Sequence, residues 1–261
     1  MDSREMTTVD IVIPVYNEEE CLPELARRLS GVMDGSPEYR WRVMLVENGS
    51  IDRSAEVIAE ICSADGRFEQ LSLVRNFGAE GGILAGMTAS DADVTVTMQA
   101  DLEDPPELIP QMLDAWRNGA LYVYASVSSR ETLPLWRRVI TPIYYKLASW
   151  ASDGAITPNA SDYRLMDRSL REVVLSISEQ NLFLRGVVTW AGFPSAAIPF
   201  ERGQRYGGAT KFRFLPALGF ATRGMLAQSN KPLRAMTLIG AALVAASVVG
   251  LVYLVWAAFF R

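Results

Sequence analysis

The sequence predicts an α/β fold, with a mostly parallel sheet flanked by helices and a C-terminal transmembrane helix. Short apolar, β-rich runs alternate with helical segments through the N-terminal half, and this alternation is typical of right-handed βαβ units. Residues 235–260 then form a run of 26 uncharged residues. About 20 apolar residues are enough to cross a bilayer, so this run predicts a membrane span.

The predicted elements follow one another in a regular order. β-rich runs place strands at 9–15, 41–46, 70–74, 94–98 and 121–127, and helical spacing of apolar residues places helices at 19–33, 52–61, 80–89 and 106–117. Asp52 is suited to cap the second helix. In parallel sheets of this kind ligands bind at the carboxyl ends of the strands, so we expect the polar residues there to meet along one edge.

Four polar clusters follow the predicted strands and form the candidate site. They are Tyr16-Asn17-Glu18, Glu47-Asn48-Gly49, Arg75-Asn76 and the segment from Gln99 to Glu103. The sequence contains neither G-x-G-x-x-G after the first strand nor a Walker P-loop, so nucleotide binding would rest on these other residues.

The fourth strand is followed by four carboxylates within seven residues, and these divide into two pairs. Asp104 as N-cap, Pro105 at the first helical position and Glu107 fit a capping box. Asp101 and Glu103 lie two residues apart, so they point the same way in an extended loop. Mg²⁺ or Mn²⁺ prefers oxygen ligands, so this pair predicts a metal site, with a plain polar turn as the alternative.

Composition excludes several classes of chemistry. The chain has no histidine, which excludes Ser-His-Asp and Cys-His mechanisms and His-ligated zinc. The two cysteines, Cys21 and Cys62, form no disulfide framework, and a reducing compartment is expected. Residues 1–120 carry 23 acids and 9 bases, whereas residues 121–261 carry 7 acids and 16 bases. This split indicates two tasks, and no feature indicates a nucleic-acid partner.

The basic residues gather before the apolar run. They are Arg202, Arg205, Lys211, Arg213, Arg223, Lys231 and Arg234. By the positive-inside rule this placement predicts that the folded domain is cytoplasmic. The aromatic, amphipathic segments 133–150 and 212–227 predict helices that either lie on the bilayer or face the core.

Six motifs in order give the sequence a specific resemblance. "DIVIPVYNEEECLPEL", "VMLVENGSIDRS", "LVRNFGAEGGILAGM", "MQADLEDPPELIPQM", "SDYRLMDRSL" and "RYGGATKF" together resemble the polyprenyl-phosphate glycosyltransferases of glycosyltransferase family 2, the group of dolichol-phosphate mannose synthase. The resemblance implies a Rossmann-like GT-A fold and transfer of a sugar from a nucleotide-diphosphate sugar, with a uridine nucleotide favoured, to a membrane polyprenyl phosphate. The expected domains are a catalytic domain at 1–200, a basic juxtamembrane amphipathic region at 201–234 and a transmembrane helix at 235–260.

The resemblance also implies roles for individual residues. The nucleotide-binding residues are expected to be Pro14, Tyr16, Asn17, Glu18, Glu47, Gly49, Arg75 and Gln99. Asp101 and Glu103 are expected to approach the metal and diphosphate, and Asp162 the reaction centre. The expected phosphate ligands are Arg130, Arg202, Arg205 and Lys211, with Arg130 and Asp101 also counted as catalytic.

The chemistry of the acceptor suggests an inverting mechanism. A phosphate monoester is largely a dianion at pH 7, so it needs little help from a general base. Its direct in-line attack on the sugar would invert the anomeric carbon. Asp162 is left with three roles: orienting a sugar hydroxyl, stabilising positive charge on the sugar, or acting as a base. Relatives usually carry carboxylates where this chain has Asn48 and Gln99, and often two membrane spans where this sequence shows one.

Two other functions remain open at this stage. One is a membrane-anchored nucleotide-sugar-binding protein without turnover, which Asn48 and Gln99 would suit. The other is transfer to a polysaccharide acceptor, although the sequence lacks the Q-x-x-R-W motif and the additional spans typical of such synthases. The oligomeric state is also open, a homo-oligomer included.

Overall fold

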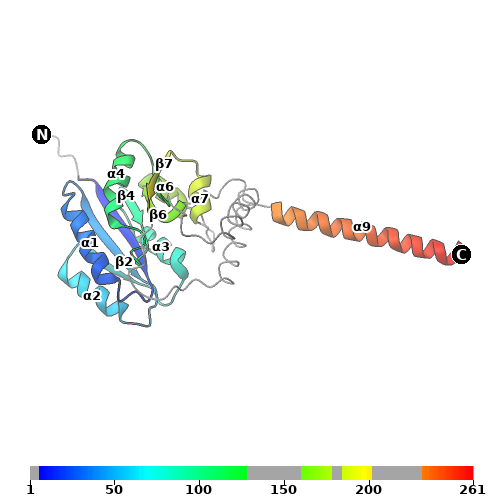
Figure 1. Ribbon diagram of the computed structural model, residues 1–261, viewed down its shortest axis with the longest axis horizontal. Helices are drawn as coiled ribbons and strands as arrows, with labels where there is room; N and C mark the ends of the chain where they lie inside the picture. Colours follow the sequence, from blue (N-terminus) through cyan, green and yellow to red (C-terminus); the bar gives the residue numbers. More distant parts are fainter. Residues whose placement is uncertain (1–5, 128–159, 178–183, 202–230, 261) are drawn as a thin grey trace.

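The sheet at the centre of the molecule has the predicted mostly parallel character. The computed structural model describes residues 6–127, 160–177, 184–201 and 231–260. Within them a seven-stranded sheet has the order β3-β2-β1-β4-β6-β5-β7 (Figure 1). The strands are β1 Thr8–Val15, β2 Arg40–Glu47, β3 Phe68–Ser72, β4 Val94–Thr97, β5 Tyr122–Val127, β6 Ala160–Asp167 and β7 Ser195–Phe200. In this described sheet β6 alone is antiparallel to its neighbours, β4 and β5.

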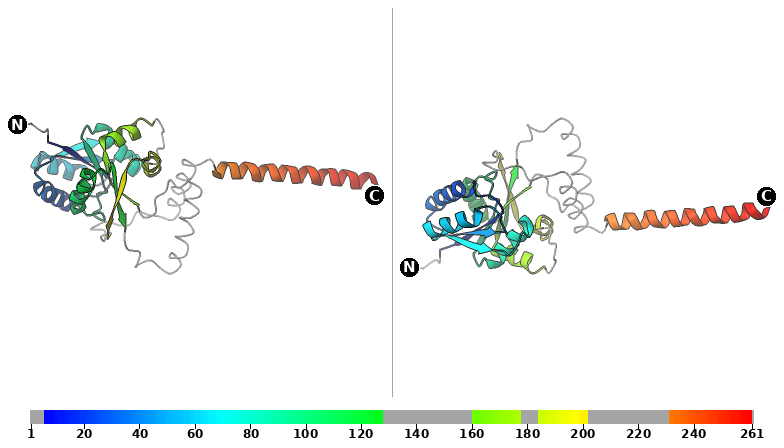
Figure 2. Two further views of the ribbon diagram at one scale, coloured as in Figure 1. Left: turned by 90° about the horizontal axis from the view of Figure 1, so that it is seen from above. Right: turned by 90° about the horizontal axis from the view of Figure 1, so that it is seen from below.

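Helices cover both faces of the sheet (Figure 2). They are α1 Leu22–Asp34, α2 Ser54–Ala64, α3 Gly78–Ala89, α4 Ile109–Arg117, α6 Arg168–Leu175 and α7 Leu184–Trp190, with a 3-10 turn, η1, at Pro106–Leu108. The apolar residues of α1, α2 and α4 pack on one face of the sheet, whereas those of α3, α6 and α7 pack on the other. Alternate residues of each strand therefore enter different cores.

Helix α3 lies unusually close to β1 because glycine faces the strand. A Cβ atom on Gly86 would be 2.3 Å from a methyl carbon of Val12, and one on Gly82 would be 2.8 Å from Cβ of Pro14. Because Gly82 and Gly86 have no side chains, the backbone of α3 packs directly against β1. This packing fixes the N-terminus of α3 at the carboxyl end of β1, where the candidate site lies.

The sequence predicted the N-terminal elements well and missed two strands. β3 begins two residues earlier than expected, and the helix expected at 106–117 is a 3-10 turn followed by α4. Asp52 accepts a hydrogen bond from the Ser54 N–H at 3.0 Å, but the N-cap position of α2 is Arg53, which forms no side-chain cap. Strands β6 and β7 were not predicted. The amphipathic segments 133–150 and 212–227 lie outside the described residues.

The predicted apolar C-terminal helix is present as α9, Lys231–Phe260. Residues 236–260 are long and apolar enough to cross a membrane, and none of the tested window is buried against the rest of the chain. At 1.5 Å per residue this stretch measures about 38 Å, against a hydrocarbon core of about 30 Å. Tyr253 and Trp256 lie near its end, where aromatic residues favour the membrane interface.

Candidate active site

A cavity of about 200 Å³ opens at the carboxyl ends of β1 and β4. Pro14, Val15 and Tyr16 line it from the end of β1, and Gln99, Ala100 and Asp101 line it from the segment after β4. The remaining lining residues are Glu18, Asn48, Asn76, Gly78 and Ala79. The structure therefore brings five of the predicted site residues, Pro14, Tyr16, Glu18, Gln99 and Asp101, to one cavity.

The loops after β1 and β2 are fastened to each other by side chains expected to contact a nucleotide. Asn17 has a positive φ of 54° and accepts a hydrogen bond from the Ile51 N–H at 2.8 Å. The buried Glu47 carboxylate accepts one from the Ser50 N–H at 2.5 Å. These two side chains shape the loops that border the cavity, and neither lines the cavity itself.

Gly49 permits close contact between the loops after β2 and β3. Its φ is +72°, and a Cβ atom there would lie 2.7 Å from the carbonyl carbon of Arg75. The Arg75 guanidinium stacks over the Phe77 ring, 4.1 Å from its centroid, and is exposed beside the cavity. A side chain at position 49 would force the two loops apart.

Asn48 is explained by its contacts in the fold. This buried amide donates to the Gly78 carbonyl at 2.9 Å and accepts from the Phe77 N–H at 2.9 Å. It thereby secures the start of α3. A carboxylate at this position could accept but could not donate, so the amide is the group that satisfies both backbone partners.

The loop that carries Asp101 and Glu103 is not extended, so one premise of the sequence prediction is wrong. Leu102, between them, has a φ of 60°, and Asp101 Oδ1 accepts a hydrogen bond from the Glu103 N–H at 3.2 Å. Asp101 lines the cavity, and Glu103 does not. Among the residues that the structure describes, no three acidic, histidine or cysteine side chains are grouped to hold a metal. Asp101 and the Gln99 amide nevertheless supply the oxygen donors that Mg²⁺ or Mn²⁺ prefers.

The predicted capping box at Asp104 and Glu107 is also wrong. The residue before η1 is Pro105, and no side chain caps the turn. Asp104 is instead buried and accepts a hydrogen bond from the Ser161 hydroxyl at 3.2 Å, whereas Glu107 forms an ion pair with Arg28. Asp104 and Glu107 therefore bond residues of β6 and α1, and neither caps the helix end that the local sequence pattern predicted.

Asp162 lies at the start of β6, beside the end of β4. The Thr97 hydroxyl donates to the Asp162 carbonyl at 3.0 Å, and the β4–β6 register pairs Thr97 with Arg164. Continuing that antiparallel register by two residues sets Asp162 opposite Gln99, which lines the cavity. The Asp162 side chain keeps one third of its surface exposed.

Two arginines hold the Asp162 carboxylate. Arg185 of α7 donates to both oxygens, at 2.8 and 2.7 Å, and Arg164 also donates to Oδ1. Burial alone would raise the pKa of the Asp162 carboxyl, but the hydrogen bonds from Arg185 and the charge of Arg164 hold this pKa well below its usual range. Asp162 is therefore an anion at neutral pH and a weak base.

Glu80 and Arg185 belong to this cluster, and sequence reasoning did not identify either of them. Glu80 is half-buried in the first turn of α3. Burial, followed by repulsion from Asp162, raises the pKa of Glu80. One available signal was Arg185 itself, the single charged residue in the run "NLFLRGVVTW".

The remaining predicted phosphate ligands lie outside the described residues. They are Arg130, Arg202, Arg205 and Lys211, in the ranges 128–159 and 202–230. Their roles stay predictions.

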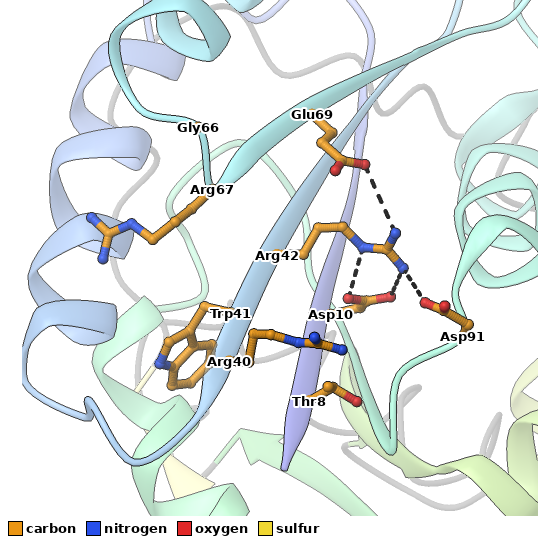
Figure 3. A pocket seen from close by; sticks show the side chains of 9 residues that line it. All are labelled: Thr8, Asp10, Arg40, Trp41, Arg42, Gly66, Arg67, Glu69 and Asp91. Atoms are coloured by element: carbon orange, nitrogen blue, oxygen red, sulfur yellow. Dashed lines mark hydrogen bonds and ion pairs between the residues drawn. The ribbon is translucent and has the colours of Figure 1, made fainter. Parts of the chain in front are cut away.

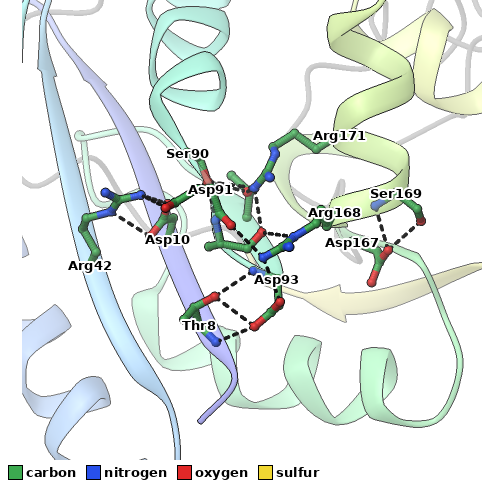
Figure 4. Close-up of polar contacts among 12 residues, drawn as sticks. Thr8, Asp10, Arg42, Ser90, Asp91, Asp93, Asp167, Arg168, Ser169 and Arg171 are labelled. Carbon is green, nitrogen blue, oxygen red and sulfur yellow. Dashed lines mark hydrogen bonds and ion pairs between the residues drawn. The ribbon is translucent and has the colours of Figure 1, made fainter. Parts of the chain in front are cut away.

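A second cavity, of about 240 Å³, lies at the opposite edge of the sheet (Figure 3). Thr8, the first residue of β1, lines it, together with Arg40, Trp41, Arg67 and an ion-pair group centred on Arg42. Arg42 bonds Asp10 at 3.0 and 2.6 Å and Asp91 at 2.8 Å. The network continues through Ser90 to Arg171 (Figure 4). These charged groups pair with one another at the amino ends of the strands, away from the carboxyl ends where ligands bind.

Comparison with known proteins agrees with this architecture. A solved structure of glucosyl-3-phosphoglycerate synthase from Mycobacterium tuberculosis, in complex with Mn²⁺, uridine diphosphate and phosphoglyceric acid, superposes with a TM-score of 0.62. It is 16% identical, and the match covers 85% of this chain and 77% of that one. At this identity the likeness concerns the fold alone, which is the GT-A fold.

Sequence relatives are closer and cover most of the chain. An uncharacterized glycosyltransferase of Bacillus subtilis, YkcC, is 36% identical over 88% of this chain and 71% of its own length. The bactoprenol glucosyl transferase of Shigella phage SfV is 32% identical over 89% and 75%, and the prophage bactoprenol glucosyl transferase homolog of Escherichia coli K12 is 33% identical over 95% and 80%. Residues 10–175 match the family described as glycosyl transferase family 2. The chain is therefore a glycosyltransferase and belongs to glycosyl transferase family 2.

Proposed function

We propose that this glycosyltransferase moves a sugar from a nucleotide-diphosphate sugar, with uridine diphosphate as the expected carrier, to a polyprenyl phosphate such as an undecaprenyl, decaprenyl or dolichyl phosphate. The acceptor is proposed from the relatives named bactoprenol glucosyl transferase and from the apolar helix α9. The observation that carries the proposal is the cavity at the carboxyl edge, where Asp101 and Gln99 meet Glu18 of the loop after β1. Transfer would take place at the cytoplasmic face of the membrane.

The cavity suits the diphosphate end of such a donor. Asp101, with the Gln99 amide, would hold Mg²⁺ or Mn²⁺, and the metal when bound would neutralise charge on the leaving diphosphate. The N-terminus of α3 also borders the cavity through Gly78 and Ala79, and the positive end of a helix dipole favours an anion there.

The state of Asp162 narrows its three candidate roles. Two guanidinium groups keep its carboxylate ionised, which makes it a poor base. The acceptor phosphate dianion is itself the nucleophile and has no hydroxyl proton to lose. Asp162 is therefore assigned to orienting a sugar hydroxyl or stabilising positive charge that develops on the sugar ring. Direct attack by the phosphate would invert the anomeric centre.

The alternative of a binding protein without turnover loses part of its support. Asn48 departs from the family pattern, but its amide satisfies two backbone groups at the start of α3. Gln99 remains the one departure within the cavity.

A donor screen tests the proposed reaction. Purified full-length protein is incubated with labelled nucleotide sugars, undecaprenyl phosphate and Mg²⁺ or Mn²⁺, and lipid-extracted product is analysed by NMR at the anomeric carbon. A lipid-linked sugar of inverted configuration is expected. Absence of lipid product with every common donor, from protein that still binds uridine diphosphate by calorimetry, would favour the binding protein instead.

A further inference from the structure

A four-residue charged cluster connects the nucleotide side of the site to Asp162. It consists of Glu80 on α3, Asp162 and Arg164 on β6, and Arg185 on α7. Asp162 and Arg164 are two residues apart on one strand, so they share the sheet face that α3 and α7 cover. Neither of the two arginines that bond Asp162 has a role in the proposed function.

Arg185 makes the stronger of the two contacts with Asp162. Its Nε and Nη2 each donate to a different carboxylate oxygen, at 2.8 and 2.7 Å, which is a bidentate geometry that fixes both the position and the plane of the carboxylate. Arg164 reaches Oδ1 through one nitrogen, and its Nε and Nη1 have no hydrogen-bond partner among the described residues. If Arg164 were its only partner, the Asp162 carboxylate could therefore rotate about a single hydrogen bond.

Glu80 lies at the start of α3, next to Gly78 and Ala79, which line the cavity. Burial and then repulsion from Asp162 raise the pKa of Glu80, whereas the charges of Arg164 and Arg185 lower it. The start of α7 is fixed to β6 by the two hydrogen bonds from Arg185 to Asp162.

We propose that Arg185 is a positioning residue that holds the Asp162 carboxylate at the reaction centre. This inference rests on the role proposed above for Asp162. It assigns Arg185 no contact with the substrate, so its effect must pass through Asp162.

A double-mutant cycle tests that dependence. Arg185→Gln is expected to lower kcat about 10- to 100-fold, as loss of an orienting partner does, while the donor KM changes less than about threefold. Arg185→Lys keeps the charge and loses the bidentate geometry, so its kcat is expected to lie between those of the wild type and Arg185→Gln. In the Asp162→Asn background Arg185→Gln is expected to cause no further loss. An equal loss in both backgrounds would overturn the proposal.

Arg168→Gln is the matched control. Arg168 is also a partly exposed arginine that bonds an aspartate, Asp93, but it lies at the opposite edge of the sheet. It is expected to keep the kcat of the wild type. If Arg185→Gln lowers kcat no more than this control, Arg185 does not position Asp162.

Hydrogen–deuterium exchange of residues 184–190 tests the same contacts without turnover. Exchange is expected to quicken in Arg185→Gln and in Asp162→Asn, but not in Arg168→Gln. Unchanged exchange in the first two variants would overturn the proposal. The double-mutant cycle gives no result if the wild type makes no lipid product or if Asp162→Asn is inactive. In either case the exchange measurement decides whether Arg185 positions Asp162. Quickened exchange together with a wild type that makes no product would refute the proposed reaction and leave the contacts established.

Discussion

At the scale of single residues, neighbouring carboxylates have different tasks because their surroundings differ. Asp101 lines the cavity, whereas Asp104 is buried and bonded to the Ser161 hydroxyl. Sequence reasoning separated these two acids correctly but attached the wrong reason, since the capping box it used for Asp104 and Glu107 is absent from η1. The partners that fix Asp104 and Glu107 are Ser161 and Arg28, which are too far away in the sequence for a local pattern to show.

Substitution of each acid by its amide separates the two roles. Asp101→Asn is expected to lower kcat by roughly 100-fold or more, because it removes the carboxylate proposed to hold the metal ion, with little change in melting temperature. Asp104→Asn is expected to lower the free energy of unfolding by about 1–3 kcal/mol, because a buried acceptor is altered. Turnover assays and thermal unfolding of both variants provide the measurement. Equal loss of activity in two stable variants would contradict this division.

Glu80 gives the stability of the folded domain an unusual pH dependence. Burial and then repulsion from Asp162 raise its pKa above the ordinary value of 4.5. The folded state thus binds this proton more tightly than the unfolded state, so the stabilisation is complete below pH about 4.5 and is lost as pH rises through the folded pKa. Glu80→Gln is expected to raise the melting temperature at pH 7.5, with a gain that shrinks toward pH 4.

Glu107 supplies a control of opposite sign for that experiment. A hydrogen bond from Arg28 lowers its pKa, so its contribution is present above the unfolded pKa and is lost as pH falls through the folded one. Glu107→Gln is expected to lower the melting temperature slightly at pH 7.5. Thermal scans of both variants at several pH values compare the two, and parallel shifts would contradict the assignment.

At the scale of elements, the sequence predicted the strands with long apolar runs and missed β6 and β7. β1 reads "TVDIVIPV" and is buried over most of its length. β6 reads "ASDYRLMD", and its Arg164 is buried although arginine usually marks a surface. The cluster of Glu80, Asp162, Arg164 and Arg185 was not predicted because Glu80 and Arg185 are about 100 residues apart, and only the packing of α3, β6 and α7 brings them near each other.

The packing of α3 on β1 can be tested at one glycine. Gly86→Ala would place a Cβ atom 2.3 Å from a Val12 methyl carbon and 3.1 Å from one of Val46, so it is expected to cost about 1–3 kcal/mol of stability. Gly31→Ala, in α1, meets no atom within 4 Å and is expected to gain about 0.5–1 kcal/mol from helix propensity. Chemical denaturation measures both. Similar effects in the two variants would show that α3 does not depend on this close approach.

At the scale of the whole molecule, charge and hydropathy suit the two proposed substrates at different parts of one chain. The acidic N-terminal half builds the carboxyl-edge cavity, and several of its arginines form ion pairs, such as Arg42 with Asp10. The basic residues before α9 suit anionic lipid headgroups and a phosphate acceptor. A lipid-linked acceptor needs an enzyme that stays at the bilayer, and α9 exposes an apolar surface that only lipid or another apolar partner would cover.

Membrane attachment through α9 can therefore be tested by placing charge at its centre. Val244 and Val248 lie one turn apart near the middle of the apolar stretch, and both are exposed. Replacing each by Asp is expected to cost about 2.5–3.5 kcal/mol per residue in a bilayer, enough to move the protein from the carbonate-washed membrane pellet to the supernatant. Val173→Asp on α6 adds a charge at another exposed valine and is expected to leave the protein in the pellet. Retention of the doubly charged variant would show that α9 is not what holds the enzyme at the membrane, and the lipid acceptor would then have to reach the site by another route.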